Sequence, residues 1–173
     1  MILDEYISHW EEYTVPRKTV MTAPGIIEKY LYFVLEGIQK AYHINGDKQH
    51  IIAFTYNPSF SGVIASFLTQ TPSNHYLETI TESKFLRISY DKHQQLMRKH
   101  REIETFARKA TELALIGTLQ RNYELTTLDI TQRFKVFAER SPHLFRLASH
   151  KDLASYLNIN STNFSKLYNS IKI

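Results

Sequence analysis

The spacing of hydrophobic and polar residues changes twice along the chain and divides it into three zones. Residues 2–12 place apolar side chains at near-helical spacing, which predicts a short N-terminal helix. From Thr14 to Ile88, short runs rich in β-branched and aromatic residues alternate with turn signals, which predicts a series of short strands. From Ser89 onward the spacing is helical again. The pattern therefore predicts an α+β protein in which a β-rich half precedes a helical half.

The predicted strands of the β-rich half are separated by Gly, Pro and Asn residues. Asn45-Gly46 is the clearest turn signal, because both residues tolerate the positive φ that a type I′ hairpin requires. Many short strands with regular turns favour a jelly-roll or sandwich-like barrel. Residues 61–70 fit the strand pattern poorly and are compatible with a short helix inside the barrel. The predicted strands span residues 18–21, 30–35, 38–44, 50–56, 76–80 and 84–88.

The helical half begins with a short helix to about His100, followed by a long helix over residues 101–126 and another over 128–140. The long helix repeats apolar or small residues at alternating spacings of three and four, which is typical of a coiled-coil seam. It is roughly 39 Å long, more than one packed face of the barrel requires. One apolar stripe of the long helix is therefore expected to cover the barrel, and another to contact a second copy of the chain. The alternative is that both stripes pack within one chain. The predicted dimerisation seam consists of Ile103, Phe106, Ala110, Leu113 and Gly117, and Leu115, Ile116 and Leu119 widen it.

The C-terminal sequence HKDLASYLNINSTNFSKLYNSIKI predicts two short helices with a tight turn between them. Asn158 stands where the turn favours a positive φ, and Ile159 is expected to fill the corner between the helices. Asn160 or Ser161 is expected to cap the second helix. One face of this helix presents polar side chains that can reach base edges and phosphates in a major groove. These side chains are Thr162, Asn163, Ser165, Lys166 and Asn169.

The charged residues are unevenly distributed, which bears on the partner of the C-terminal segment. Residues 1–126 contain 14 basic and 14 acidic side chains, whereas residues 127–173 contain seven basic and three acidic ones. The formal net charge of +4 therefore lies entirely in the second segment. A neutral body with a basic end favours a polyanion such as nucleic acid, and a chance excess of lysine is the alternative.

Composition excludes several classes of protein. Hydrophobic residues make up 43% of the chain and charged residues 22%, which is ordinary for a globular protein, and no apolar run is long enough to span a bilayer. The chain contains no cysteine, which excludes a disulfide framework and a thiolate metal site. The first residues, MILDEYISHWEEY, lack the basic and apolar regions of a secretory signal, so we expect a cytoplasmic protein without a membrane partner.

Candidate catalytic and metal-binding residues are few. The eight histidines include no His-x-His pair, and His43 and His50, which flank the predicted hairpin, are not expected to be direct cross-strand partners. No serine has the surroundings of a nucleophile with its base. We therefore expect neither an enzyme nor a metal site, and we keep a cupin-like enzyme as the weakest alternative.

The order of these elements resembles the CRP/FNR superfamily of bacterial transcription regulators over essentially the whole chain. The similar pieces are YLYFVLEGIQKAYHINGDKQHIIAFTYNPSF, ASFLTQTPSNHYLETITESKFLRI and HKDLASYLNINSTNFSKLYNSI, of which the second is similar to Bacteroidetes members. The resemblance implies a cyclic nucleotide-binding-like sensory β-roll over residues 1–100, a dimerisation helix over 101–126 and a helix-turn-helix domain over 127–173. It also implies a homodimer that binds double-stranded DNA, with RNA polymerase as a further candidate partner.

The roll departs from the family pattern where the family binds cyclic nucleotides. Gly62 is followed by Val63 rather than by glutamate, and Ser73-Asn74 stands near the place of the family's Arg-Ser pair. No arginine occurs between residues 17 and 87, so a bidentate guanidinium clamp on phosphate is missing and tight cAMP binding is not expected. We predict no cofactor. The weakly indicated effector pocket comprises Phe60, Gly62, Ser73 and Asn74, and Lys29, Lys40, Lys48 and Lys84 are expected to be solvated.

The helix-turn-helix also departs from the pattern. Lys166 stands where the family usually has arginine, Thr162 where it often has glutamate, and the family's C-terminal wing does not follow the recognition helix. An effector-free or degenerate member that acts as a protein-interaction module is therefore the alternative to a DNA-binding regulator. For the regulator, the residues expected to contact phosphate are Arg146, His150, Lys151 and Lys172.

Overall fold

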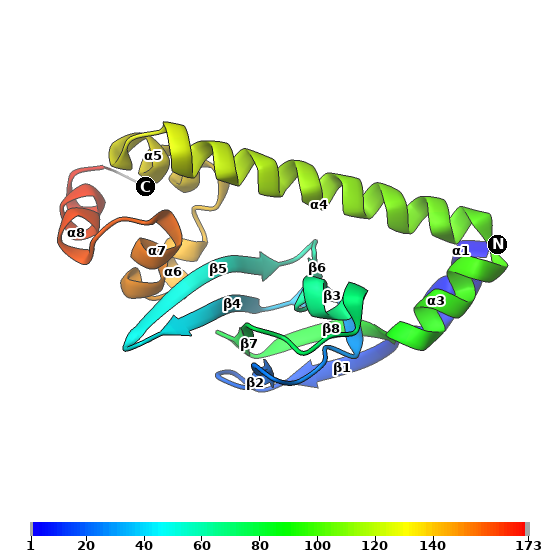
Figure 1. Ribbon diagram of the computed structural model, residues 1–173. Coiled ribbons are helices and arrows are strands. Elements are labelled where there is room, and N and C mark those ends of the chain that lie inside the picture. The colour runs from blue at the N-terminus through cyan, green and yellow to red at the C-terminus, as the bar shows by residue number, and fades with distance from the viewer. Residues whose placement is uncertain (1, 172–173) are drawn as a thin grey trace.

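The computed structural model describes residues 2–171 and shows a β-sandwich followed by helices (Figure 1). One sheet has the strand order β1-β8-β3-β6 and the other β2-β7-β4-β5. The chain thus forms the mixed fold with an N-terminal sandwich that the residue pattern predicts. The strands are β1 (Glu11–Val15), β2 (Val20–Thr22), β3 (Tyr30–Glu36), β4 (Ile38–Asn45), β5 (Lys48–Tyr56), β6 (Phe60–Ser61), β7 (Tyr76–Thr79) and β8 (Ser83–Ser89).

The predicted strands are all present within a few residues, but the N-terminal prediction is wrong at its end. Helix α1 stops at Ser8, and residues 11 and 12, predicted to be helical, open strand β1. This strand pairs antiparallel with β8 and places Tyr13 opposite the fully buried Phe85. Pairing with a distant strand therefore overrides the local helical spacing. The two-residue strand β6 was also not predicted.

The β4–β5 hairpin has a different turn from the predicted one. Asn45 pairs with Lys48, so Gly46 and Asp47 are the two central residues. Gly46 has a positive φ (+58°), whereas Asp47 is not among the described residues with positive φ. A type I′ turn requires positive φ at both central residues and a type II′ turn only at the first, so this turn fits type II′. The same register places His43 directly opposite His50, contrary to the sequence-based prediction.

The helices follow the predicted order. Ser89 caps α3 by accepting a hydrogen bond from the Lys92 backbone N–H, and Asp129 forms a capping box with Gln132 at the start of α5. Helix α2 lies within residues 61–70, as expected, whereas the single turn α6 was not predicted. The helices are α1 (Ile2–Ser8), α2 (Ile64–Thr69), α3 (Tyr90–Lys99), α4 (Arg101–Thr127), α5 (Ile130–Arg140), α6 (Leu144–Leu147), α7 (His150–Leu157) and α8 (Ser161–Ser170).

The turn between α7 and α8 has the predicted geometry. Asn158 is left-handed (φ 52°, ψ 49°), and the side chain of Asn160 caps α8 by accepting from the Asn163 backbone N–H at 2.8 Å. Ile159 is buried in the corner between the two helices. Phe164 is fully buried on the inner face of α8 and packs edge-on against Phe134 of α5. The position of α8 is therefore fixed by both its cap and its core.

Helix α4 is held at both ends and is exposed between them (Figure 1). At its start, Ile103 is fully buried against Tyr6, Ile88 and Leu96. Near its end, the Glu124 carboxylate binds both terminal nitrogens of Arg140, at 2.7 and 3.0 Å. Every residue from 111 to 120 is exposed. The long helix therefore links the sandwich to the C-terminal helices with its middle unsupported by the rest of the chain.

We expect Gly37→Ala to destabilise the fold more than Gly46→Ala. Both glycines have positive φ, which costs an alanine roughly 1–2 kcal/mol. A Cβ at Gly37 would also overlap the Glu82 carbonyl oxygen and the Ser83 side chain, whereas one at Gly46 would meet nothing within 4 Å. Overpacking should add about 1–3 kcal/mol at Gly37 alone. Urea unfolding of the two variants measures the difference, and equal losses of unfolding free energy would contradict it.

Candidate nucleic-acid interface

The outer face of α8 presents polar side chains to solvent. Thr162, Ser165, Lys166 and Asn169 are exposed and Asn163 is half-buried. The Ser165 hydroxyl donates to the Ser161 carbonyl, but within residues 2–171 no hydrogen bond engages the other four side chains. Because the opposite face of α8 is anchored in the core, this face combines a fixed backbone with free donors and acceptors. Such a face can bind base edges or phosphates.

Basic side chains predicted to contact phosphate lie around the start of α7. Arg146, His150 and Lys151 are all exposed. Ser149 caps α7 by accepting from the Asp152 backbone N–H at 3.0 Å, and the His150 ring lies 4.3 Å from the ring of Tyr168 on α8. The positive end of the α7 dipole therefore coincides with cationic side chains. Lys172, the fourth predicted contact, lies outside the described residues.

The predicted dimerisation seam divides into an exposed and a buried part. Leu113 is 70% exposed and Phe106 41% exposed, Ala110 is half-buried, and Gly117 is exposed, with open space where a Cβ would stand. Ile103 instead packs inside the chain. Leu115, Ile116 and Leu119, which widen the seam, are each more than half exposed.

An apolar groove of about 490 Å³ runs between α4 and the sandwich. Its walls come from α1, β3, β6, α2, α3 and α4, and they include Phe33, Phe60, Phe67, Leu68, Phe106 and Leu113. The groove continues the exposed apolar surface of α4. Apolar area of this kind is unfavourable in water and is typical of surfaces that bind other molecules.

The four residues of the predicted effector pocket have different immediate surroundings. Phe60 lies in the α4 groove and contacts Phe33 edge-on. The Ser73 hydroxyl donates to the His75 carbonyl and accepts from the His75 backbone N–H, so it is used within its own loop. Asn74 is exposed, and its carbonyl oxygen lies 2.9 Å from Nδ1 of His43. Gly62 lies at the start of the α2 segment, beside the Tyr30 carbonyl oxygen.

A buried carboxylate that the sequence reasoning missed lies at the start of α2. Glu28 is 3% exposed, and its Oε2 accepts from the Thr22 hydroxyl at 2.6 Å and from the Val63 backbone N–H at 3.4 Å. Its Oε1 accepts from the Tyr30 backbone N–H at 3.3 Å. Burial raises the pKa of Glu28, and these hydrogen bonds act in the opposite direction. The chain's own carboxylate thus already occupies the N-terminal end of α2.

The half-buried Arg87 is a second residue that sequence reasoning did not identify. It lies opposite Tyr32, which is 5% exposed, so both side chains point to the same face of the sheet. Its guanidinium stacks between the rings of Tyr13 and Tyr30, at 4.0 and 4.4 Å, and its Nη2 lies 3.3 Å from a Glu11 carboxylate oxygen. The Arg87 side chain retains 23% of its exposure, and the two aromatic rings and Glu11 hold its guanidinium at the surface of this sheet. The alternation that points Tyr30, Tyr32 and Phe85 inward was the signal that could have revealed it.

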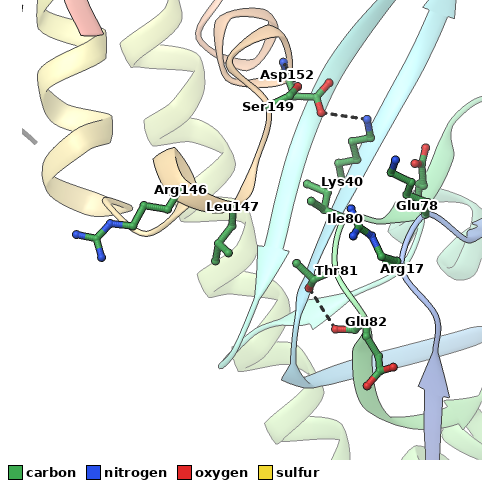
Figure 2. A pocket seen from close by; sticks show the side chains of 11 residues that line it. Arg17, Lys40, Glu78, Ile80, Thr81, Glu82, Arg146, Leu147, Ser149 and Asp152 are labelled. Atoms are coloured by element: carbon green, nitrogen blue, oxygen red, sulfur yellow. Dashed lines mark hydrogen bonds and ion pairs between the residues drawn. The ribbon is translucent and has the colours of Figure 1, made fainter. Parts of the chain in front are cut away.

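The sandwich and the C-terminal helices meet along the β4–β5 hairpin. Lys40 of β4 donates to Asp152 of α7 at 3.1 Å, with both side chains nearly buried, so the expectation that Lys40 is solvated is wrong. Figure 2 shows this contact at the edge of a cleft of about 550 Å³, with Arg17 on the sandwich side and Arg146 pointing away from it. The sequence gives no signal for the contact, because it joins residues 112 positions apart.

The described part of the chain lacks two other kinds of feature. No group of three or more His, Asp or Glu side chains in residues 2–171 is placed to hold a metal ion. None of the helices in this range combines the length and hydrophobicity that a membrane span needs.

Comparison with known proteins shows what the chain is similar to. The sequence model of the cyclic nucleotide-binding domain matches residues 14–100. The fold is similar to that of FixK2 from Bradyrhizobium japonicum, with a TM-score of 0.79 and 15% sequence identity over 92% of this chain and 83% of that one. It is also similar to the c-di-GMP responsive global regulator CLP of Xanthomonas campestris, with a TM-score of 0.70 and 19% identity over 97% of this chain and 89% of that one. A third similar structure is the catabolite activator protein of Thermus thermophilus, with a TM-score of 0.61 and 16% identity over 98% of this chain and 81% of that one. At these identities the similarity establishes the fold. No curated protein matches the sequence.

We expect Glu28→Gln to change the pH dependence of folding. Because burial raises the pKa of Glu28, the folded protein binds this proton more tightly than the unfolded chain does. The carboxylate therefore costs stability above its folded-state pKa, and the cost is relieved as the pH falls toward the ordinary value. In urea unfolding over a pH series, the unfolding free energy of the wild type minus that of the variant should rise as the pH is lowered.

A second substitution tests the cause of this pH dependence. The Thr22 hydrogen bond lowers the pKa of Glu28 in the folded protein, so Thr22→Val should raise that pKa further and extend the pH-dependent window upward, with its lower limit unchanged. A difference between wild type and Glu28→Gln that stays constant with pH would show that Glu28 does not titrate differently in the two states.

Proposed function

The chain belongs to the cyclic nucleotide-binding domain family, and from this premise we propose that it is a homodimeric, DNA-binding transcription regulator of CRP/FNR type. The observation that carries the proposal is the outer face of α8, where five polar side chains project from a helix that is capped and anchored in the core, four of them without a hydrogen-bond partner among residues 2–171. The similarity in fold to a global regulator and to a catabolite activator protein, over more than nine-tenths of the chain, supports the same function. Its domains are a sensory roll over residues 1–100, a dimerisation helix over 101–126 and a helix-turn-helix domain over 127–173.

In this proposal α7 and α8 form the helix-turn-helix and α8 is the recognition helix. Thr162, Asn163, Ser165, Lys166 and Asn169 face the major groove and read base edges. Arg146, His150, Lys151 and Lys172 contact phosphates and fix the register of the protein on the duplex. The excess of basic side chains in residues 127–173 supports this division, because phosphate contacts supply much of the affinity.

The proposed dimer forms through α4. The exposed Leu113, Leu115, Ile116 and Leu119, together with the apolar groove that Leu113 also lines, offer apolar surface for the same helix of a second copy. A two-fold dimer would place two recognition helices about 34 Å apart, which matches a pseudo-palindromic site.

The roll is proposed not to respond to cAMP. A phosphate at the start of α2 would meet the buried Glu28 carboxylate there, and within the described chain no arginine side chain lies beside it to offset the repulsion. The same observation favours a second candidate function, an effector-free family member whose roll serves as a protein-interaction module.

We expect Lys166→Ala to weaken binding to DNA from the gene's own upstream region by about 1–3 kcal/mol, because the lysine would lose a contact to a base edge. Fluorescence anisotropy across a salt series, with and without cAMP, measures the change. Lys48→Ala is the matched control, since Lys48 is an exposed lysine at the tip of the β4–β5 hairpin and is not one of the predicted DNA-contacting residues. An unchanged preference for upstream over scrambled DNA in Lys166→Ala would count against its role in recognition.

We expect Leu113→Glu combined with Ile116→Glu to convert a dimer into monomers, because each charge would be buried in the α4 interface without a partner. Sedimentation equilibrium measures the mass in solution. Ile44→Glu is the control, because Ile44 is an exposed apolar residue on the hairpin. A wild-type protein that is monomeric, or a double variant that remains dimeric, would exclude this surface as the interface.

A further inference from the structure

The first helix of the proposed helix-turn-helix is bonded to an edge strand of the sandwich. Strand β5 lies at the end of its sheet, so one side of its backbone has no neighbouring strand. The Ser155 hydroxyl accepts from the Ile51 backbone N–H at 3.0 Å and donates to the Gln49 carbonyl at 3.0 Å. One side chain of α7 therefore satisfies a donor and an acceptor of the strand edge together.

The position of this contact is set by an irregularity in β5. The pairing runs Ala41 to Ala53 and then Tyr42 to Ile51, so Ile52 is an extra residue on the β5 side. A bulge of this kind bends the strand and redirects the neighbouring backbone groups. Ser155 bonds to the backbone immediately before the extra residue. The contact is therefore specific to one point along the strand rather than spread along its edge.

A nearly buried ion pair accompanies the serine contact. Lys40 and Asp152 retain only 11% and 12% of their side-chain exposure, and the ammonium group also donates to the Gln49 side chain at 3.3 Å. Ions in such surroundings tolerate little displacement, because a separated charge would lose its partner without regaining water. We call Ser155, Lys40 and Asp152 the clasp.

Other contacts surround the clasp without covering the outer face of α8. The Tyr56 hydroxyl lies 2.6 Å from that of Ser141, and the Phe54 ring packs on the ring of Tyr156. From the other side, Arg121 of α4 stacks on the Tyr156 ring and donates to its carbonyl at 2.7 Å. Helix α7 is thus held between the sandwich and α4, while four of the five predicted base-contacting residues of α8 are exposed.

We propose that the clasp residues are positioning residues for DNA binding, which hold the helix-turn-helix on the roll in an orientation that DNA can engage directly. This rests on the proposed function. In a dimer the orientation of each recognition helix would be fixed before DNA arrives, so the entropic cost of ordering the two helix-turn-helix units is avoided at binding. The roll then acts as a rigid platform for the DNA-binding domain.

The experiment compares Ser155→Ala, Lys40→Glu and the charge-exchanged pair Lys40→Glu/Asp152→Lys in the full chain. Hydrogen exchange of residues 48–56 without DNA reports the clasp itself, and anisotropy with upstream-region DNA over a salt series reports its consequence. Both single variants should exchange faster at Ile51 and bind DNA about tenfold more weakly. The exchanged pair should recover at least part of both losses, because it restores opposite charges.

The salt dependence separates positioning from simple destabilisation. A protein whose two helix-turn-helix units no longer engage together makes fewer phosphate contacts, so the slope of log affinity against log salt should decrease in the single variants. A variant that is only partly unfolded would lose active fraction and keep the wild-type slope. Two controls match the changes: Ser8→Ala removes an exposed serine on α1, and Lys84→Glu breaks the exposed ion pair with Glu36 on the sandwich.

The outcomes distinguish this proposal from the proposed function. Single variants that bind DNA as the wild type does, or more tightly, would overturn the positioning role while leaving the regulator intact. A wild type that protects Ile51 from exchange but prefers neither upstream nor scrambled DNA would contradict the regulator itself.

Discussion

The packing of the C-terminal helices on the sandwich is the constraint on which the rest of the structure depends. The hydrophobic core of these helices is shared with the sandwich: Phe137, Phe145 and Phe164 belong to the same cluster as Ile38 of β4. Phe54, Tyr56 and Ile80 of the sandwich pack against that cluster. A helical unit of this size buries little apolar surface alone, and the sandwich supplies the missing wall. The sandwich thereby helps to cover the apolar inner faces of α5 and α7. The outer face of α8, which carries polar residues, stays at the surface.

Much of the fold could be predicted because local signals and tertiary packing agree. The left-handed Asn158, the Asn160 cap and the buried Ile159 each express a local preference that the folded chain satisfies. The prediction was wrong where a distant partner decides the outcome. Residues 11 and 12 continue a helical pattern in the sequence, but the free edge of β8 draws them into a strand. The register of His43 and His50 depended on which residues form a two-residue turn.

The candidate site was only partly predictable, for a similar reason. The polar face of α8 follows from helical periodicity, so its members could be named from the sequence alone. The roles of Lys40 and Glu28 could not, because each depends on a neighbour far along the chain: Asp152 for Lys40 and Val63 for Glu28. Sequence spacing also grouped Ile103 with the exposed seam of α4, although the adjacent helices bury it. Periodicity shows which residues share a face, and packing decides which part of that face stays exposed.

The two anchors of α4 have a mechanical consequence. The sandwich touches the start of α4 through Ile103, α4 touches the C-terminal helices through Arg121 and Glu124, and those helices touch the sandwich through β5. The sandwich, α4 and the C-terminal helices therefore contact one another in a closed ring. None of the three can move relative to the other two unless at least one of these contacts breaks. A rotation of α4 imposed by a neighbouring molecule would therefore strain all three contacts together. The weakest of the three contacts would then break first, and its position would determine which part of the protein moves.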